Sequence, residues 1–245
     1  MTHGITAVYL RELSILKRRL KRQLAGMAVS PLLYLIAFGY AMGSQVRLDG
    51  HSYLAFLIPG LVAMSTMTQS FGIASDINVA RFYWYIFEEF QAAPISNFAY
   101  VTGEVLAGMT RALLSVLVIL ALALPFGVSL HYGPLFWLAV VLNSFVFAAL
   151  AVGLAMLVKS HADQALLNSF VITPMAFLGG TFFPVDRLPV WAQKILSLLP
   201  LTHASGAIRA VALGKSPEPM AYGVLLLTGA LFFWMALSSV NRARD

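Results

Sequence analysis

Cysteine is absent from this chain of 245 residues, and charged residues are scarce. Without cysteine the chain can form neither a disulfide framework nor a thiolate metal site. Charged residues make up 11% of the chain and hydrophobic ones 60%, whereas about a quarter of an average soluble domain is charged. One water-soluble core cannot bury this much apolar surface. The composition therefore excludes an ordinary soluble domain and indicates that lipid is the main solvent.

Catalytic and nucleotide-binding motifs are also missing. The five histidines are scattered, with no HExxH motif and no paired metal spacing, and no G-x-S-x-G occurs. LGKS at 213–216 resembles the end of a phosphate-binding loop, but that motif needs a glycine five residues before Gly214, where Arg209 stands. We therefore expect no catalytic residue, no metal site and no cofactor in this chain.

Positive charge is concentrated near the N-terminus. The net charge is +6, and six of the sixteen Lys and Arg residues lie between Arg11 and Arg22, directly before the first apolar run. This is where positive residues gather at a cytoplasmic membrane boundary, so we expect lipid rather than nucleic acid as a partner. A cleaved signal peptide is the alternative for this segment.

Residues 1–24 carry a helical pattern, which favours a retained surface helix. Its apolar residues are Tyr9, Leu13, Leu16 and Leu20, while Arg11, Arg18 and Arg22 point away. The pattern predicts an amphipathic helix in the membrane interface.

Six long apolar runs follow and predict an all-α membrane protein in one domain, 1–245. They are Ala25–Met42, Tyr53–Ala74, Phe98–Leu124, Leu135–Val158, Gln164–Phe183 and Met220–Val240. Spanning helices need roughly 20 apolar residues. An even number of spans puts both termini on one side, and the basic head and tail make that side the cytoplasm.

The stretch 184–217 between the last two runs is broken by prolines. Its apolar part, Leu188–Pro200, is too short to span. Trp191, Ile195 and Leu198 share one helical face, which predicts an amphipathic helix that dips into the outer membrane surface. This topology places ten basic residues inside and five outside, so the positive-inside rule still favours it. The five external ones run against the rule, and snorkelling of their side chains to water would accommodate them.

Two further features leave alternatives open. Glu104 and Arg111 lie inside the third run, where charges either line a polar pathway or link helices, or else sit at the interface and anchor packing. The polar stretch 76–97 predicts a short helix stopped by Pro94, with aromatics beside Glu88 and Glu89. It fits a protein partner or the lipid surface.

The order of these parts resembles the type 2 ATP-binding-cassette exporter permeases. The matching pieces are the basic head, YLAFLIPGL, FEEFQAAPIS and, most specific, FLGGTFFPVDRLPVWAQKILSLLPLTHASGAIRA. The resemblance covers essentially the whole chain and is greatest to permeases that export lipo-oligosaccharides or lipid-linked glycans, with drug exporters also similar. Arg111 departs from many relatives and leaves the substrate open.

The resemblance implies a permease in the bacterial inner (cytoplasmic) membrane that pairs with a second permease copy and two copies of a cytoplasmic ABC ATPase subunit. That ATPase would hold ATP and Mg. Segment 1–24 would be the connecting helix, 76–97 the coupling segment and 184–217 an external re-entrant gate. An ion- or proton-driven carrier or channel, or a membrane anchor without transport, remains an alternative.

The residues expected in each role follow from this resemblance and from the pattern. For coupling they are Arg81, Phe82, Trp84, Phe87, Glu88, Glu89 and Pro94. At the membrane interface they are Arg11, Lys17, Arg18 and Arg22. In the gate they are Phe183, Pro184, Leu188, Pro189, Trp191, Pro200, His203 and Arg209. A pathway could be lined by Met67, Gln69, Glu104, Arg111, Asn168 and Thr173. The four uncharged residues among them could equally be packing contacts between helices.

Overall fold

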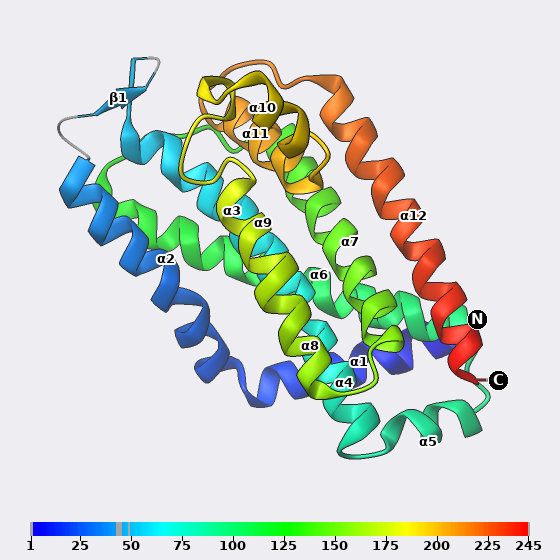
Figure 1. Cartoon of the computed structure of the whole chain (residues 1–245). Helices are drawn as coiled ribbons and strands as arrows, with labels where there is room; N and C mark the ends of the chain where they lie inside the picture. The colour runs from blue at the N-terminus through cyan, green and yellow to red at the C-terminus, as the bar shows by residue number, and fades with distance from the viewer. Residues whose placement is uncertain (1, 43–45, 49, 245) are drawn as a thin grey trace.

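The chain folds into a bundle of helices with a small hairpin at one end (Figure 1). The structure is a computed structural model that describes residues 2–42, 46–48 and 50–244. The first helices are α1 (Thr2–Arg18), α2 (Leu20–Met42), α3 (Tyr53–Phe71), α4 (Ile73–Phe82), α5 (Ile86–Ala92) and α6 (Asn97–Ala123). Then come η1 (Leu124–Phe126), α7 (Pro134–Leu157), α8 (His161–Leu167), η2 (Asn168–Ile172), α9 (Thr173–Leu178), η3 (Val185–Arg187), α10 (Val190–Leu196), α11 (Pro200–Ala212) and α12 (Pro219–Arg244). The all-α prediction is thus confirmed apart from the hairpin, in which β1 (Arg47–Leu48) pairs antiparallel with β2 (His51–Ser52).

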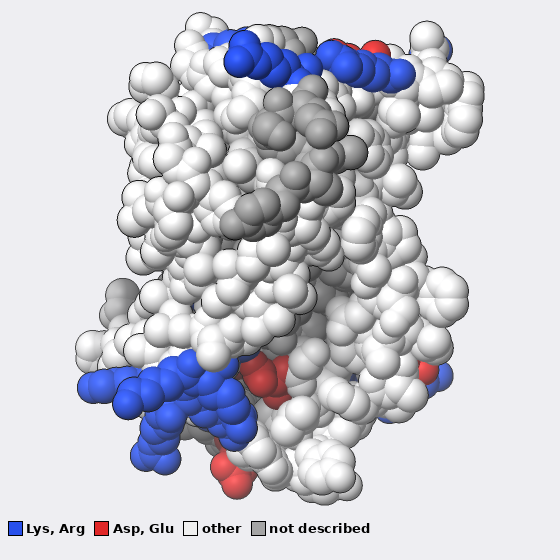
Figure 2. Space-filling model, turned by 90° about the vertical axis from the view of Figure 1, so that its left-hand side faces the viewer, with Lys and Arg blue, Asp and Glu red and all other residues white. Residues whose placement is uncertain are grey.

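The charges are distributed as a membrane protein requires. Figure 2 shows Lys, Arg, Asp and Glu gathered at the two ends of the visible face, with a broad uncharged band between them. In the described chain, four helical stretches are long and apolar enough to span: Tyr53–Phe82, Asn97–Phe126, Pro134–Leu157 and Pro219–Arg242. A fifth counts if α10 and α11, bent by 97°, form one span. The protein is membrane-embedded, while the predicted number of six remains a prediction, because α2 and the α8–η2–α9 segment are not among these stretches.

Helix α3 forms the centre of the bundle. Leu57, Ile58, Leu61 and Val62 are completely buried, and the helix packs against α6, α7 and α11. Helix α7, rich in alanine, packs on its other side against α12. Small side chains let the helix backbones approach closely. In lipid the hydrophobic effect does not draw helices together, so this van der Waals packing is a main source of attraction between them.

The second apolar run continues further than predicted. Helix α3 ends at Phe71, with Gly72 as its C-cap, and α4 extends the same apolar stretch as far as Phe82. The segment 76–97 therefore holds the end of α4 and the separate helix α5, rather than one short helix. Tyr85, at φ 55°, turns the chain between them, and Pro94 follows the end of α5 at Ala92.

The fifth apolar run is helical but irregular. A π-helical turn, η2, separates α8 from α9, and the Thr173 hydroxyl donates to the Asn168 carbonyl at 2.9 Å. Pro174 follows at once in the first turn of α9 and has no N–H, so the regular hydrogen bond back to the Phe170 carbonyl is missing. Figure 1 shows this segment running beside α3 along the height of the bundle.

The end of the bundle opposite the chain termini carries η3, α10 and α11 (Figure 1). The predicted stretch Leu188–Pro200 contains α10 at Val190–Leu196, preceded by Pro189. Pro200 occupies the first turn of α11, where its missing N–H would be unpaired in any case. The prolines thus mark the starts of both helices, as the sequence indicates.

Candidate functional site

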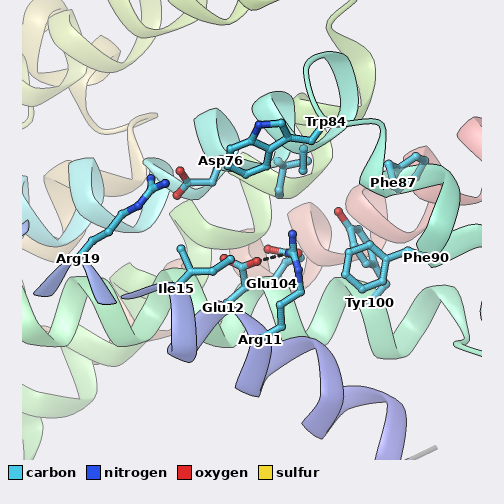
Figure 3. Close-up of a pocket in the computed structure, with 12 residues that line it drawn as sticks. Arg11, Glu12, Ile15, Arg19, Asp76, Trp84, Phe87, Phe90, Tyr100 and Glu104 are labelled. Atoms are coloured by element: carbon cyan, nitrogen blue, oxygen red, sulfur yellow. Dashed lines mark hydrogen bonds and ion pairs between the residues drawn. The ribbon is translucent and has the colours of Figure 1, made fainter. Parts of the chain in front are cut away.

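A cluster of charged residues joins three helices at the end of the bundle that carries α5. Arg111 of α6 pairs with Asp76 of α4, and its Nη2 lies 3.9 Å from Glu12 Oε2 of α1. Glu12 also pairs with its neighbour Arg11. Figure 3 shows Glu12, Glu104 and Asp76 converging from these helices around one small cavity. Arg111 therefore links helices, which is one of the two roles that the sequence allowed for it.

Glu104 lies beside this cluster and is almost completely buried, with 2% of its surface exposed. Its Oε2 has no hydrogen-bond partner among the described residues. A carboxyl without a partner is costly to keep charged away from water. The side chain therefore lies in the interior of the bundle rather than at an exposed membrane interface.

Glu12 is the acid of this cluster that lies on α1, outside the candidate spans. Burial raises the pKa of Glu12 above its ordinary value of 4.5, and the charges of Arg11 and Arg111 oppose the rise. Neither Glu12 nor Asp76 was predicted from the sequence as a site residue. The sequence does show an acid on the inward face of a basic helix, which could have indicated Glu12. The partners of that acid lie far along the chain and could not be found in the same way.

The inward face of α1 differs from the predicted one. Val8, Glu12 and Leu16 are buried, whereas Tyr9 and Leu13 are only partly so. Helix α1 ends at Arg18, so the predicted helix over 1–24 is interrupted and Arg22 lies at the start of α2. Lys17, Arg18 and Arg22 are exposed, as residues at a membrane interface are expected to be. Arg11 does not point away, contrary to expectation: it contacts Glu12 and lies over the Phe90 ring at 5.1 Å. The reason is the buried carboxylate, which turns the helix to face α6.

The predicted coupling residues surround the turn between α4 and α5. Arg81 lies over the rings of Phe82 and Phe87, at 5.0 and 5.5 Å, and donates to the Ala155 carbonyl of α7. Phe87 is buried against Tyr100 of α6. Glu89 is exposed, and the side chain of Glu88 lies outside the described part. Arg81 and Phe87 thus hold α5 onto the bundle.

Three consecutive aromatic residues at this turn are exposed. Tyr83, Trp84 and Tyr85 have 80%, 50% and 63% of their surface accessible. Only Trp84 was expected here as a functional residue. Aromatic side chains are enriched both in the buried cores of protein interfaces and at the membrane–water interface, so this exposed group fits a partner surface or the lipid headgroups.

At the opposite end, Arg209 holds the predicted gate against α3. Its guanidinium donates to the carbonyls of Phe56 at 3.1 Å and Gly180 at 2.6 Å, and lies 3.8 Å from the Phe56 ring. Gly60 faces this contact: a Cβ there would lie 2.8 Å from Arg209 Nη2. Gly60 therefore lets α3 approach the Gly180–Thr181 backbone closely.

The remaining gate residues divide into a fixed set and an exposed set. His203 Nε2 lies 2.8 Å from the Ser197 carbonyl and thereby ties α11 to the turn before it. Phe183, Pro184 and Leu188 are partly buried, as is Pro200, and Pro189 is exposed. Trp191, Ile195 and Leu198 are 68%, 55% and 81% exposed, so the described residues leave most of the predicted apolar face uncovered.

The candidate pathway residues are not gathered in one place. Met67 is completely buried in the core and Gln69 partly buried. Asn168 and Thr173 flank the π-helical turn, where Phe170 is 75% exposed. Such turns are frequent at functional sites. Glu104 and Arg111 belong instead to the charge cluster at the α5 end.

Comparison with known proteins assigns these features to a family. The ABC-2 type transporter family matches residues 3–213. The inner membrane transport permease YadH of Escherichia coli (strain K12) is 29% identical over 248 residues, covering 98% of this chain and 96% of YadH. Nodulation protein J of Rhizobium meliloti (strain 1021) is 34% identical over 215 residues, which cover 85% of this chain and 81% of nodulation protein J. Nodulation protein J of Rhizobium leguminosarum bv. viciae is 32% identical over 237 residues, which cover 94% of this chain and 89% of that protein. The chain belongs to the ABC-2 type transporter permease family.

Proposed function

We propose that this permease moves an amphipathic substrate out of the cytoplasm or the inner leaflet: a lipid-linked glycan, a lipo-oligosaccharide or a hydrophobic drug. ATP hydrolysis takes place on a separate cytoplasmic ATPase, present in two copies, which carries the ATP and Mg that this chain has no motif to bind. The exposed aromatic group 83–85 beside α5 is the observation that supports this most directly, because it offers a partner a surface attached to the bundle interior.

The proposed mechanism starts at the α4–α5 turn. ATP binding closes the ATPase dimer and moves α5, and the charge cluster passes that movement to α1 and α6 through Glu12, Asp76 and Arg111. A second permease copy completes the translocation path, and both chain termini lie on the cytoplasmic side, in the inner membrane. The substrate leaves past the Arg209 clamp and the helices α10 and α11.

Co-purification with an ABC ATPase from the same genome tests the proposal. Tyr83→Ala, which shortens the most exposed aromatic of the turn, is expected to weaken ATPase binding at least about tenfold, the loss typical of an interface anchor. Trp234→Ala in α12 is the matched control, because Trp234 is 67% exposed on another surface. If Tyr83→Ala binds the ATPase and supports export as the wild type does, the coupling role is wrong.

An ion- or proton-driven carrier is the second candidate. The buried Glu104, whose Oε2 lacks a partner, favours it, because intramembrane acids serve as proton relays. Transport by the purified chain in vesicles without ATPase or ATP would support this candidate. Loss of all transport without ATP would exclude it.

A further inference from the structure

A large cavity opens between the gate helices and α12 at the end of the bundle that carries α10. Its volume is about 750 Å³, within the range of about 300–1,000 Å³ of small-molecule sites. Leu48, Phe56 and Ala221 supply apolar surface from the hairpin, α3 and α12. The cavity therefore combines parts of the chain that are far apart in the sequence.

Charged groups of mainly positive sign line this cavity. Arg187, Lys194, Arg209 and Lys215 contribute four cations, against the two acids Asp186 and Glu218. Lys194 lies in the last turn of α10, is exposed and forms no ion pair in the described part of the chain. Figure 2 shows Lys and Arg atoms gathered at this end, beside fewer acidic ones. The cavity thus offers a positive wall to a negatively charged group.

Hydroxyl groups stand among these cations. Ser197, Thr202, Ser205 and Ser216 line the cavity. The Oγ1 of Thr202, in the first turn of α11, is buried and has no hydrogen-bond partner among the described residues. A buried hydroxyl without a partner is costly, and a helix N-terminus favours anions. The rest of the side chain reaches the cavity, so rotation about its Cα–Cβ bond would aim this hydroxyl at a bound oxyanion, which would accept the missing hydrogen bond.

The same cations are the exception to the positive-inside rule. Proteins of this kind keep Lys and Arg in cytoplasmic loops, yet Arg187, Lys194, Arg209 and Lys215 fall together on the side assigned as external. Arg209 has its own role in the clamp through Phe56 and Gly180. For the others, a common function within the cavity gives a reason to retain positive charge there.

We propose that this cavity binds a phosphate group at the outer face of the membrane, carried by a phospholipid headgroup or by a phosphate-bearing exported molecule. Lys194 supplies the charge, Thr202 donates a hydrogen bond, and the apolar wall holds the adjoining carbon chain. Only the side of the membrane rests on the proposed function. The binding chemistry does not require the ATPase.

Glycerol 3-phosphate and inorganic phosphate are the probes, titrated by calorimetry into the full chain in dodecyl maltoside, a detergent without phosphate, with glycerol as the uncharged control. Both phosphates are expected to bind and glycerol not. Lys194→Glu is expected to weaken glycerol 3-phosphate binding about tenfold or more, and Thr202→Val, which keeps the shape, several-fold. Arg242→Glu makes the same change of net charge near the C-terminus and is expected to bind as the wild type does.

Nanodiscs with phosphatidylglycerol then separate the two sources of phosphate. Competition by that lipid identifies a lipid headgroup as the natural ligand, and its absence identifies a soluble or exported phosphate. No phosphate binding by the wild type, or unchanged binding by both Lys194→Glu and Thr202→Val, overturns the proposal. Wild-type protein that co-purifies with the ATPase but binds no phosphate refutes this inference alone.

Discussion

Gly60 provides the sharpest test of the gate, because Gly60→Ala adds one methyl group at the closest helix contact there. The new Cβ would overlap the Thr181 carbonyl oxygen and lie 3.0 Å from Thr181 Cα and 2.8 Å from Arg209 Nη2. Backbone atoms cannot rotate away, so α3 and the Gly180–Thr181 segment must separate. The separation lengthens the hydrogen bonds of Arg209 to Phe56 and Gly180.

The expected loss of stability in Gly60→Ala follows from three contributions. Overpacking costs about 1–3 kcal/mol, and a lost hydrogen bond to a charged group about 1.5–3 kcal/mol. The higher helix propensity of alanine returns about 1 kcal/mol. We therefore expect Gly60→Ala to lower the free energy of unfolding by about 2–5 kcal/mol.

The measurement is thermal unfolding of the purified chain, followed by tryptophan fluorescence, together with export by cells that carry the variant. Gly223→Ala in α12 is the matched control, because no atom of the described residues lies within 4 Å of a Cβ at that position. The control should unfold at the wild-type temperature or slightly above it. Equal stability of Gly60→Ala and Gly223→Ala would refute the proposed close contact.

The charge cluster and α1 give three more predictions. Arg111→Met leaves Glu12 and Asp76 without their shared cation and should destabilise the chain by about 3–5 kcal/mol; adding Asp76→Asn should restore part of this in a double-mutant cycle. Gly103→Ala would bring a Cβ to 2.7 Å from a side chain of α1 and should release α1 from α6, seen as faster proteolysis of the N-terminus. Burial raises the pKa of Glu12, so its contribution to stability is complete below its unfolded pKa and is lost as the pH rises through the folded pKa. Glu12→Gln should therefore gain stability relative to the wild type as the pH rises from about 4.5. Glu89→Gln, at an exposed position, is the control and should show no such gain. A difference in free energy of unfolding between Glu12→Gln and the wild type that stays constant with pH would contradict this.

The limits of the helices were largely predictable from the sequence. The third predicted run, Phe98–Leu124, differs by one residue at each end from α6, and the fourth, Leu135–Val158, likewise from α7. Both segments follow from composition, because apolar length decides what can cross lipid. The extension of the second run to Phe82 was missed because Asp76 and Arg81 appear solvent-facing when their partners are unknown.

The contacts at both ends could not be predicted in the same way. The sequence contains Pro59–Gly60 and Gly179–Gly180 as conspicuous pairs, but only the fold brings Gly60 against Thr181 and Arg209. Glu12 is similar: a helical wheel does not reveal Arg111, which lies far along the chain and makes the burial of this acid acceptable. Local pattern predicts which residues are helical, and pairing across the bundle decides which polar groups are inside.

The Arg209 clamp and the charge cluster lie on one continuous pair of helices, α3 and α4, which gives the proposed coupling a physical route. Helix α3 carries Phe56 and Gly60 at the Arg209 clamp, and α4 continues it past Gly72 to Asp76 in the charge cluster. The break at Gly72 is small, since this residue keeps helical angles of φ −56° and ψ −21°. A packed core deforms little, so movement of α5 transmitted through Asp76 would shift α3 as a unit. The first contact to change at the other end would be that between Gly60 and the gate.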